Sequence, residues 1–212
     1  PILIENAYGS VSVSPGSDRV VRARIRKVVY ANEARARDIA PEIRLEAGAA
    51  KGGGPSTAAK PGTELGKASD VEYFVVGTNR EALSSKNYIY NTDLEITVPK
   101  NSQIQIRNSF GDVHVTGIIG KIDIDATHRS LEVLDCTGEF TLATRFAESR
   151  LVNLVGNVKL DSRSRGKIYI ENIKGDLDVT SEYSPLEIFN VDGTLQLSNT
   201  EGSIRVERIT KP

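Results

Sequence analysis

The chain of 212 residues has no tryptophan, no methionine and one cysteine, Cys136, and aromatic residues make up only 6% of it. A single cysteine excludes an internal disulfide framework. Because large rings are scarce, we expect a core made mainly of Val, Ile and Leu, which favour strands. No apolar run approaches the roughly 18 residues that a membrane-spanning helix needs. The sequence therefore predicts a β-rich fold without a membrane-spanning segment.

The charges nearly cancel, with 27 basic and 28 acidic residues and a formal net charge of −1. No overall electrostatic field favours nucleic acid, so we expect no nucleic-acid partner. The length suits one sizeable domain or two small ones. The chain begins with Pro1 and not with Met, and we therefore expect a mature protein or an excised fragment.

Residues 104–209 contain a nine-residue unit that is repeated eleven times with one slip. Units begin at residues 111, 120, 129, 138, 147 and 156 and, after one extra residue within 161–165, at 166, 175, 184, 193 and 202. The side chains two and four positions after each start are apolar, with the exception of Ser149. Side chains two apart share one face of a strand, so each unit predicts a short strand with two inward side chains, followed by a turn.

Alternate units differ in their turns, which doubles the period. Every other unit has one more apolar residue at its seventh position: Ile118, Cys136, Leu154, Ile173, Val191 and Ile209. The period is therefore about 18 residues, with two strands per coil, and it predicts an all-β fold, a parallel β-solenoid or β-helix. An antiparallel meander or sandwich stays open as the alternative, because it also has short strands and turns.

Two ladders of similar residues at coil-equivalent positions favour the solenoid. One ladder reads Gly117, Asp135, Asn153, Asn172, Asn190 and Arg208, and its three Asn predict a side-chain amide ladder. The other reads Phe110, His128, Phe146, Arg165, Tyr183 and Glu201, and its four rings predict an aromatic stack along one edge.

We divide the chain into an N-terminal capping region, 1–103, and the repeat region, 104–212, within one continuous domain. Residues 2–13 echo residues 104–115 in their apolar, Asn, aromatic and Gly positions. The chain is therefore expected to begin with a coil-like copy of the repeat entrance.

The segment between these two copies is expected to cap or flank the first coil, because an exposed coil end aggregates. It predicts one short helix at 32–40, with Asn32 as N-cap and Pro41 after its end. Strands are expected at 20–29, 42–46, 71–76 and 94–98, and a mobile loop at 49–69.

The segment Leu94-Glu95-Ile96-Thr97-Val98-Pro99-Lys100, followed by Gly-x-Val-x-Val repeats, resembles the adhesin-like family of bacterial envelope proteins. So does the opening Asn6-Ala7-Tyr8-Gly9-Ser10-Val11-Ser12-Val13, and the resemblance covers nearly the whole chain except 49–69. It implies a β-solenoid-like domain outside the cytoplasm, at the cell surface or in the periplasm. From it we expect a non-enzymatic scaffold or adhesin-like protein that contacts a protein or glycan.

A group of basic residues is the candidate site for an anionic partner. If successive coils gather them along one edge, they would attract an anionic glycan or an acidic protein. Glu148 and Asp161 lie among them, so a solvated face is the alternative. The candidates are Arg145, Arg150, Lys159, Arg163, Arg165 and Lys167.

No cofactor or metal site is expected. Of the two histidines, His114 lies at an outward strand position and His128 lies in the ring ladder. Calcium-binding repeats require Asp at a fixed position of each unit, and here the Asp residues occupy several different positions. Two other functions stay open. One is a subunit that self-assembles through its solenoid ends, and the other is a carbohydrate-active enzyme with Asp123 and Asp125, near Asp112, as candidate acids.

Overall fold

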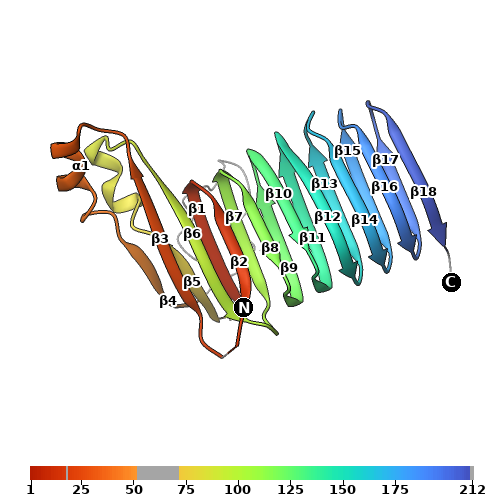
Figure 1. The fold of residues 1–212 in the computed structure, drawn as a ribbon, viewed down its shortest axis with the longest axis horizontal. Helices are drawn as coiled ribbons and strands as arrows, with labels where there is room; N and C mark the ends of the chain where they lie inside the picture. Colours follow the sequence, from red (N-terminus) through yellow and green to blue (C-terminus); the bar gives the residue numbers. More distant parts are fainter. Residues whose placement is uncertain (18, 52–71, 211–212) are drawn as a thin grey trace.

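The structure, a computed structural model, describes residues 1–17, 19–51 and 72–210, and these form a parallel β-solenoid (Figure 1). Eighteen strands and two short helices occur in these residues, and the strands lie in two facing stacks. From the N-terminal end, the first stack contains β4 (Leu45–Lys51), β5 (Glu72–Thr78), β1 (Ile2–Tyr8), β7 (Ile104–Phe110), β9 (Ile119–Ala126), β11 (Thr137–Arg145), β13 (Val158–Arg163), β15 (Leu177–Glu182) and β17 (Leu195–Asn199). The second contains β3 (Arg22–Val29), β6 (Tyr90–Pro99), β2 (Val11–Gly16), β8 (Val113–Thr116), β10 (Arg129–Leu134), β12 (Ala147–Val155), β14 (Ile168–Lys174), β16 (Leu186–Asp192) and β18 (Ile204–Thr210).

The strand register confirms the predicted period and excludes the antiparallel alternative for the repeat region. Phe140 lies beside Val158, at an offset of 18 residues, and the two strands are parallel. For the strand pairs that span the slip the offset is 19, as in the pair of Ser149 and Ile168, and beyond them it is 18 again. Because β11 and β13 keep the offset of 18 up to their last residues, the extra residue lies in the turn at 164–167.

The start of the chain is a coil of the solenoid and does not form its end. β1 pairs with β7 on one side, with Ile2 beside Ile104, and with β5 on the other. β2 lies likewise between β6 and β8. The predicted echo between 2–13 and 104–115 is thus confirmed as direct stacking of two coils.

The N-terminal end of the solenoid is covered, as expected. β3 and β4 pair antiparallel with β6 and β5, and the short helices α1 (Glu33–Ile39) and η1 (Glu81–Lys86, a 3-10 helix) lie at the same end (Figure 1). The predicted N-cap is present, because the Asn32 side chain accepts a hydrogen bond of 2.9 Å from the backbone N–H of Arg35.

The predicted bounds of one strand and of the loop after it need correction. The strand expected at 42–46 begins only at Leu45 and continues to residue 51, so the first three residues of the loop expected at 49–69 belong to β4. Pairing with β5 along its whole length extends β4 this far, despite its Gly and Ala residues. The rest of the expected loop lies outside the described residues.

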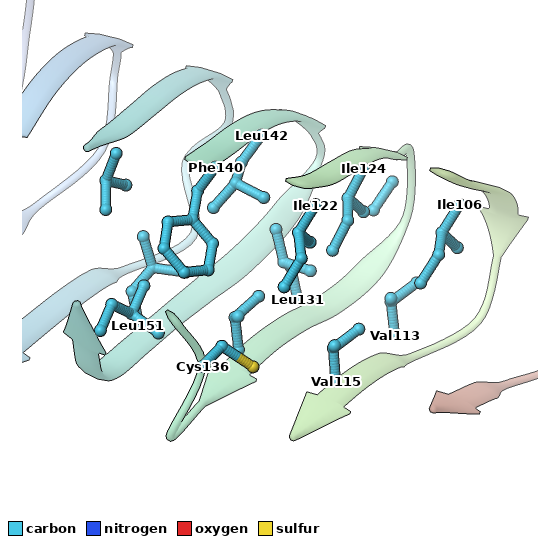
Figure 2. Packing of buried hydrophobic residues seen from close by; sticks show 14 of the residues in the cluster. Ile106, Val113, Val115, Ile122, Ile124, Leu131, Cys136, Phe140, Leu142 and Leu151 are labelled. Carbon is cyan, nitrogen blue, oxygen red and sulfur yellow. The ribbon is translucent and has the colours of Figure 1, made fainter. Parts of the chain in front are cut away.

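The core is a continuous column of inward Val, Ile and Leu side chains (Figure 2). Ile122, Ile124 and Leu131 are fully buried, and Phe140 is the largest fully buried side chain. Cys136 is also buried in this column, as predicted, and burial raises the pKa of its thiol. Each fully buried side chain of this size contributes about 1.5–3 kcal/mol, so the column is the main source of stability.

The Asn ladder is confirmed and has charged residues at both ends. At one end, Asn153 Nδ2 donates a hydrogen bond of 2.7 Å to Asp135 Oδ1. Asn172 Nδ2 donates to Asn153 Oδ1, and Asn190 Nδ2 donates to Asn172 Oδ1, both at 2.9 Å. At the other end, Arg208 Nε donates to Asn190 Oδ1 at 2.6 Å. A carboxylate only accepts and a guanidinium only donates, so every amide between them has both partners. All five residues have φ between 54° and 57°, a conformation that Asn tolerates better than most residues.

The ladder predicts a graded response to substitution of its central residue. Asn172→Ala removes two side-chain hydrogen bonds and places a residue with a Cβ but no polar group at φ 57°. We expect a loss of about 2 kcal/mol in the free energy of unfolding. Asn172→Gly removes the same bonds without the backbone strain, so urea denaturation should show a smaller loss. Equal losses for the two variants would show that the backbone conformation contributes nothing.

Candidate functional site

The predicted ring stack lies along the edge where the chain passes from the first stack of strands to the second. Tyr8 stacks on Phe110 with ring centroids 4.8 Å apart, Phe110 on His128 at 4.4 Å, and His128 on Phe146 at 5.3 Å. His128 Nδ1 also lies 3.1 Å from the carbonyl oxygen of Ser109. The stack is therefore confirmed for Phe110, His128 and Phe146 and includes Tyr8 from the first coil of the chain, whereas the predicted member Tyr183 stacks on no ring of the described residues.

The stack is interrupted at the slip, and a cavity of about 890 Å³ lies there. Arg165 takes the next ladder position after Phe146, and Tyr183 takes the one after that. Phe146 is 69% exposed and Tyr183 is 46% exposed. We call this cavity the corner slot, and it is lined by Arg129, Phe146, Ala147, Glu148, Arg163, Ser164, Arg165, Gly166, Glu182 and Tyr183.

Backbone strain accompanies the slot. Phe146 has φ 55°, Tyr183 has φ 68° and Arg129 has φ 90°, values that side chains with a Cβ rarely adopt. Each such residue costs on the order of 1–3 kcal/mol. Residues of the Asn ladder have similar values, so this conformation belongs to the tight turns of the solenoid.

The slot carries an excess of positive charge, because three arginines and two glutamates line it. Arg163 Nε lies 3.8 Å from Glu182 Oε1, a weak ion pair. Within 1–17, 19–51 and 72–210, Arg129 and Arg165 have no carboxylate within 4.0 Å. Two guanidinium groups are thus available to a negatively charged ligand.

The six predicted basic residues do not form one continuous edge. Only Arg163 and Arg165 line the slot. Arg145 lies beside Arg163 in the register of β11 and β13 and forms an ion pair of 3.6 Å with Asp125. Lys159 lies at the other end of β13 and lines a separate cavity of about 380 Å³.

Arg150 lies on the second stack, Lys167 lies directly before β14 of that stack, and both already have partners. Arg150 Nη1 lies 2.9 Å from Glu132 Oε1, and Lys167 Nζ lies 2.7 Å from Glu187 Oε2. Both cations also lie within 6 Å of the Tyr169 ring, with distances of 5.8 and 5.7 Å to its centroid. Two strands per coil place residues that are near in sequence on different faces, which separates the six.

The candidate acids do not come together either. Asp123 and Asp125 share the outer face of β9, whereas Asp112 lies in the turn after β7 and accepts a hydrogen bond of 2.7 Å from Ser130. Burial raises the pKa of Asp123, although Lys121 and Arg107 oppose this effect. In the part of the chain that the structure describes, no group of three or more His, Cys, Asp and Glu side chains could hold a metal ion.

A third cavity, of about 850 Å³, lies near the covered end and includes Arg80. The Arg80 guanidinium lies 4.8 Å from the centroid of the Tyr8 ring and 3.9 Å from that of Tyr90, and its Nη2 donates to the Tyr90 carbonyl oxygen at 2.8 Å. Burial lowers the pKa of Arg80 and raises that of Tyr90. These contacts fasten the start of η1 to the solenoid, which is a structural role.

The chain matches no protein-family model, no curated protein and no solved structure. No helix among the described residues is long and apolar enough to cross a membrane.

Proposed function

We propose that the protein is a non-enzymatic interaction scaffold of the bacterial envelope, adhesin-like in its role, whose corner slot binds an acidic saccharide. The observation that carries this proposal is the slot itself, where two exposed rings and two guanidinium groups without carboxylate partners line one cavity. The envelope location and the adhesin-like role are supported by the sequence resemblance. The stacked coils support a scaffold, because a continuous core makes the solenoid rigid.

The spacing of the two rings suits a saccharide. Phe146 and Tyr183 belong to coils two steps apart, which corresponds to about 10 Å along the solenoid axis. One pyranose ring between them would pack its apolar C–H faces on both aromatic rings. Arg165 belongs to the coil between them and lines the slot, and its planar guanidinium would form a bidentate hydrogen bond with a uronic acid carboxylate.

Binding of the whole chain to immobilised polymers tests this proposal. We expect retention on polygalacturonate and no retention on neutral dextran or on polyaspartate, because the slot requires both a sugar ring and a carboxylate. Phe146→Ala and Arg165→Gln should each abolish retention, whereas Lys159→Gln, outside the slot, should not. Equal retention on polyaspartate would replace the saccharide with a general acidic partner. Cleavage of the polygalacturonate would contradict a non-enzymatic role.

A further inference from the structure

The two ends of the solenoid differ in how well they are protected. At the C-terminal end, the last coil consists of β17 and β18, which we call the end coil (Figure 1). Its inward residues Ile204, Val206 and Ile209 are 51%, 36% and 38% exposed. The residues that precede them by one coil, Leu186, Ile188 and Val191, are at most 1% exposed. The end coil therefore presents a core surface without a cover in the described residues.

β18 also presents a free strand edge. It pairs with β16 on one side and with no strand of the described residues on the other. At the opposite end, the edge strand β3 carries Arg22, Arg24, Arg26 and Lys27, and charged side chains discourage pairing between edges. Among the described residues, one end is thus covered and the other exposes apolar side chains together with an unpaired strand edge.

We propose that the end coil binds the end coil of a second copy of this chain, with the two β18 strands antiparallel and Val206 on the two-fold axis. In this register Val206 faces its counterpart, and Ile204 and Val206 of both copies close the two cores. Each Arg205 lies opposite Glu207 of the other copy. Opposite charges in directly facing positions of an antiparallel pair are stabilising.

The charges on β18 favour this arrangement over the others. Arg205 Nη2 already lies 2.6 Å from Glu207 Oε1 in the same strand, so the dimer would contain a ring of four alternating charges. A shift that centres the pair on Arg205 would place two arginines face to face. A head-to-tail stack would place Arg205 near the basic strand β3 of the next copy. Among the registers centred on Arg205, Val206 or Glu207, only the one centred on Val206 places each Arg205 opposite a Glu207.

An interface with two-fold symmetry closes after two copies. The expected product is therefore a discrete dimer of elongated shape, with the two covered ends pointing outward, and no filament forms. The corner slots remain accessible, because Phe146 and Tyr183 do not belong to the end coil. This inference does not depend on the ligand proposed for the slot.

Sedimentation equilibrium of the whole chain, with substitutions that exchange charge, tests the pairing. The wild type should be a dimer of twice 23.0 kDa. Arg205→Glu should raise the dissociation constant of the dimer about tenfold or more, because it faces two like-charged pairs. The double variant R205E/E207R should restore the wild-type constant, and this rescue excludes misfolding as the cause.

Val206→Lys should give a monomer with unchanged circular dichroism, since two lysines would meet on the axis. Ile89→Lys, at an exposed residue near the covered end, is the matched control and should leave the dimer intact. A wild-type monomer at the highest concentration would overturn the proposal. So would species larger than a dimer, or a failure of the double variant to rescue association.

Discussion

Gly138→Ala should destabilise the protein by more than about 3 kcal/mol, the largest loss that we expect from a single added methyl group. Gly138 has φ 142°, and a Cβ built at this position would lie 1.8 Å from the carbonyl oxygen of Gly120 in the preceding coil. That oxygen belongs to the backbone, so it can move away only if the two neighbouring coils separate. The substitution would therefore separate neighbouring coils, and urea denaturation should show a lower midpoint concentration of urea.

Gly48→Ala is the matched control for this substitution. Gly48 lies in β4, and a Cβ there would meet no atom of the described residues within 4 Å. We expect its free energy of unfolding to stay within about 0.5 kcal/mol of wild type. Similar losses for both variants would show that the close contact between coils at Gly138 and Gly120 does not exist in solution.

Phe140→Ala should destabilise the protein by about 3–5 kcal/mol, because it removes the largest fully buried side chain from the central column. Inward neighbours from adjacent coils, Ile122 and Val158, are fixed by the strand register and cannot collapse into the space. Phe146→Ala changes the same residue type at an exposed position and should cost less than about 1 kcal/mol in thermal or urea denaturation. A loss below 1 kcal/mol for Phe140→Ala would contradict the core assignment.

The repeat region could be predicted from the sequence because its rules are local. Alternation within each unit determines which side chains point inward, and a constant offset of 18 residues determines which of them stack. The ladder of Phe110, His128 and Phe146 follows from the same offset, and the ladder of Asn153, Asn172 and Asn190 follows from it together with the one-residue slip. Each additional coil repeats one contact pattern, so a single pattern describes half of the chain.

The N-terminal part and the corner slot follow no such rule. The coil of β5 and β6 comes later in the chain than the coil of β1 and β2. In the solenoid, however, the coil of β5 and β6 lies nearer the covered end, and only contacts between distant segments establish that order. Sequence spacing predicted the basic residues near position 160 to be neighbours, but the corner between the two stacks of strands separates them. The useful signal was the interrupted ring ladder at Arg165, which marks the slot between Phe146 and Tyr183.

Calorimetric titration of tetragalacturonate into the wild type and into Arg165→Gln tests the central functional claim most directly. Binding by the slot predicts a saturable 1:1 interaction per chain with the wild type and at least about tenfold weaker binding to Arg165→Gln, since a charge-assisted bidentate contact is lost. Lys159→Gln should bind as the wild type does. No heat of binding with the wild type, or equal affinities for the wild type and Arg165→Gln, would contradict the assignment of the slot.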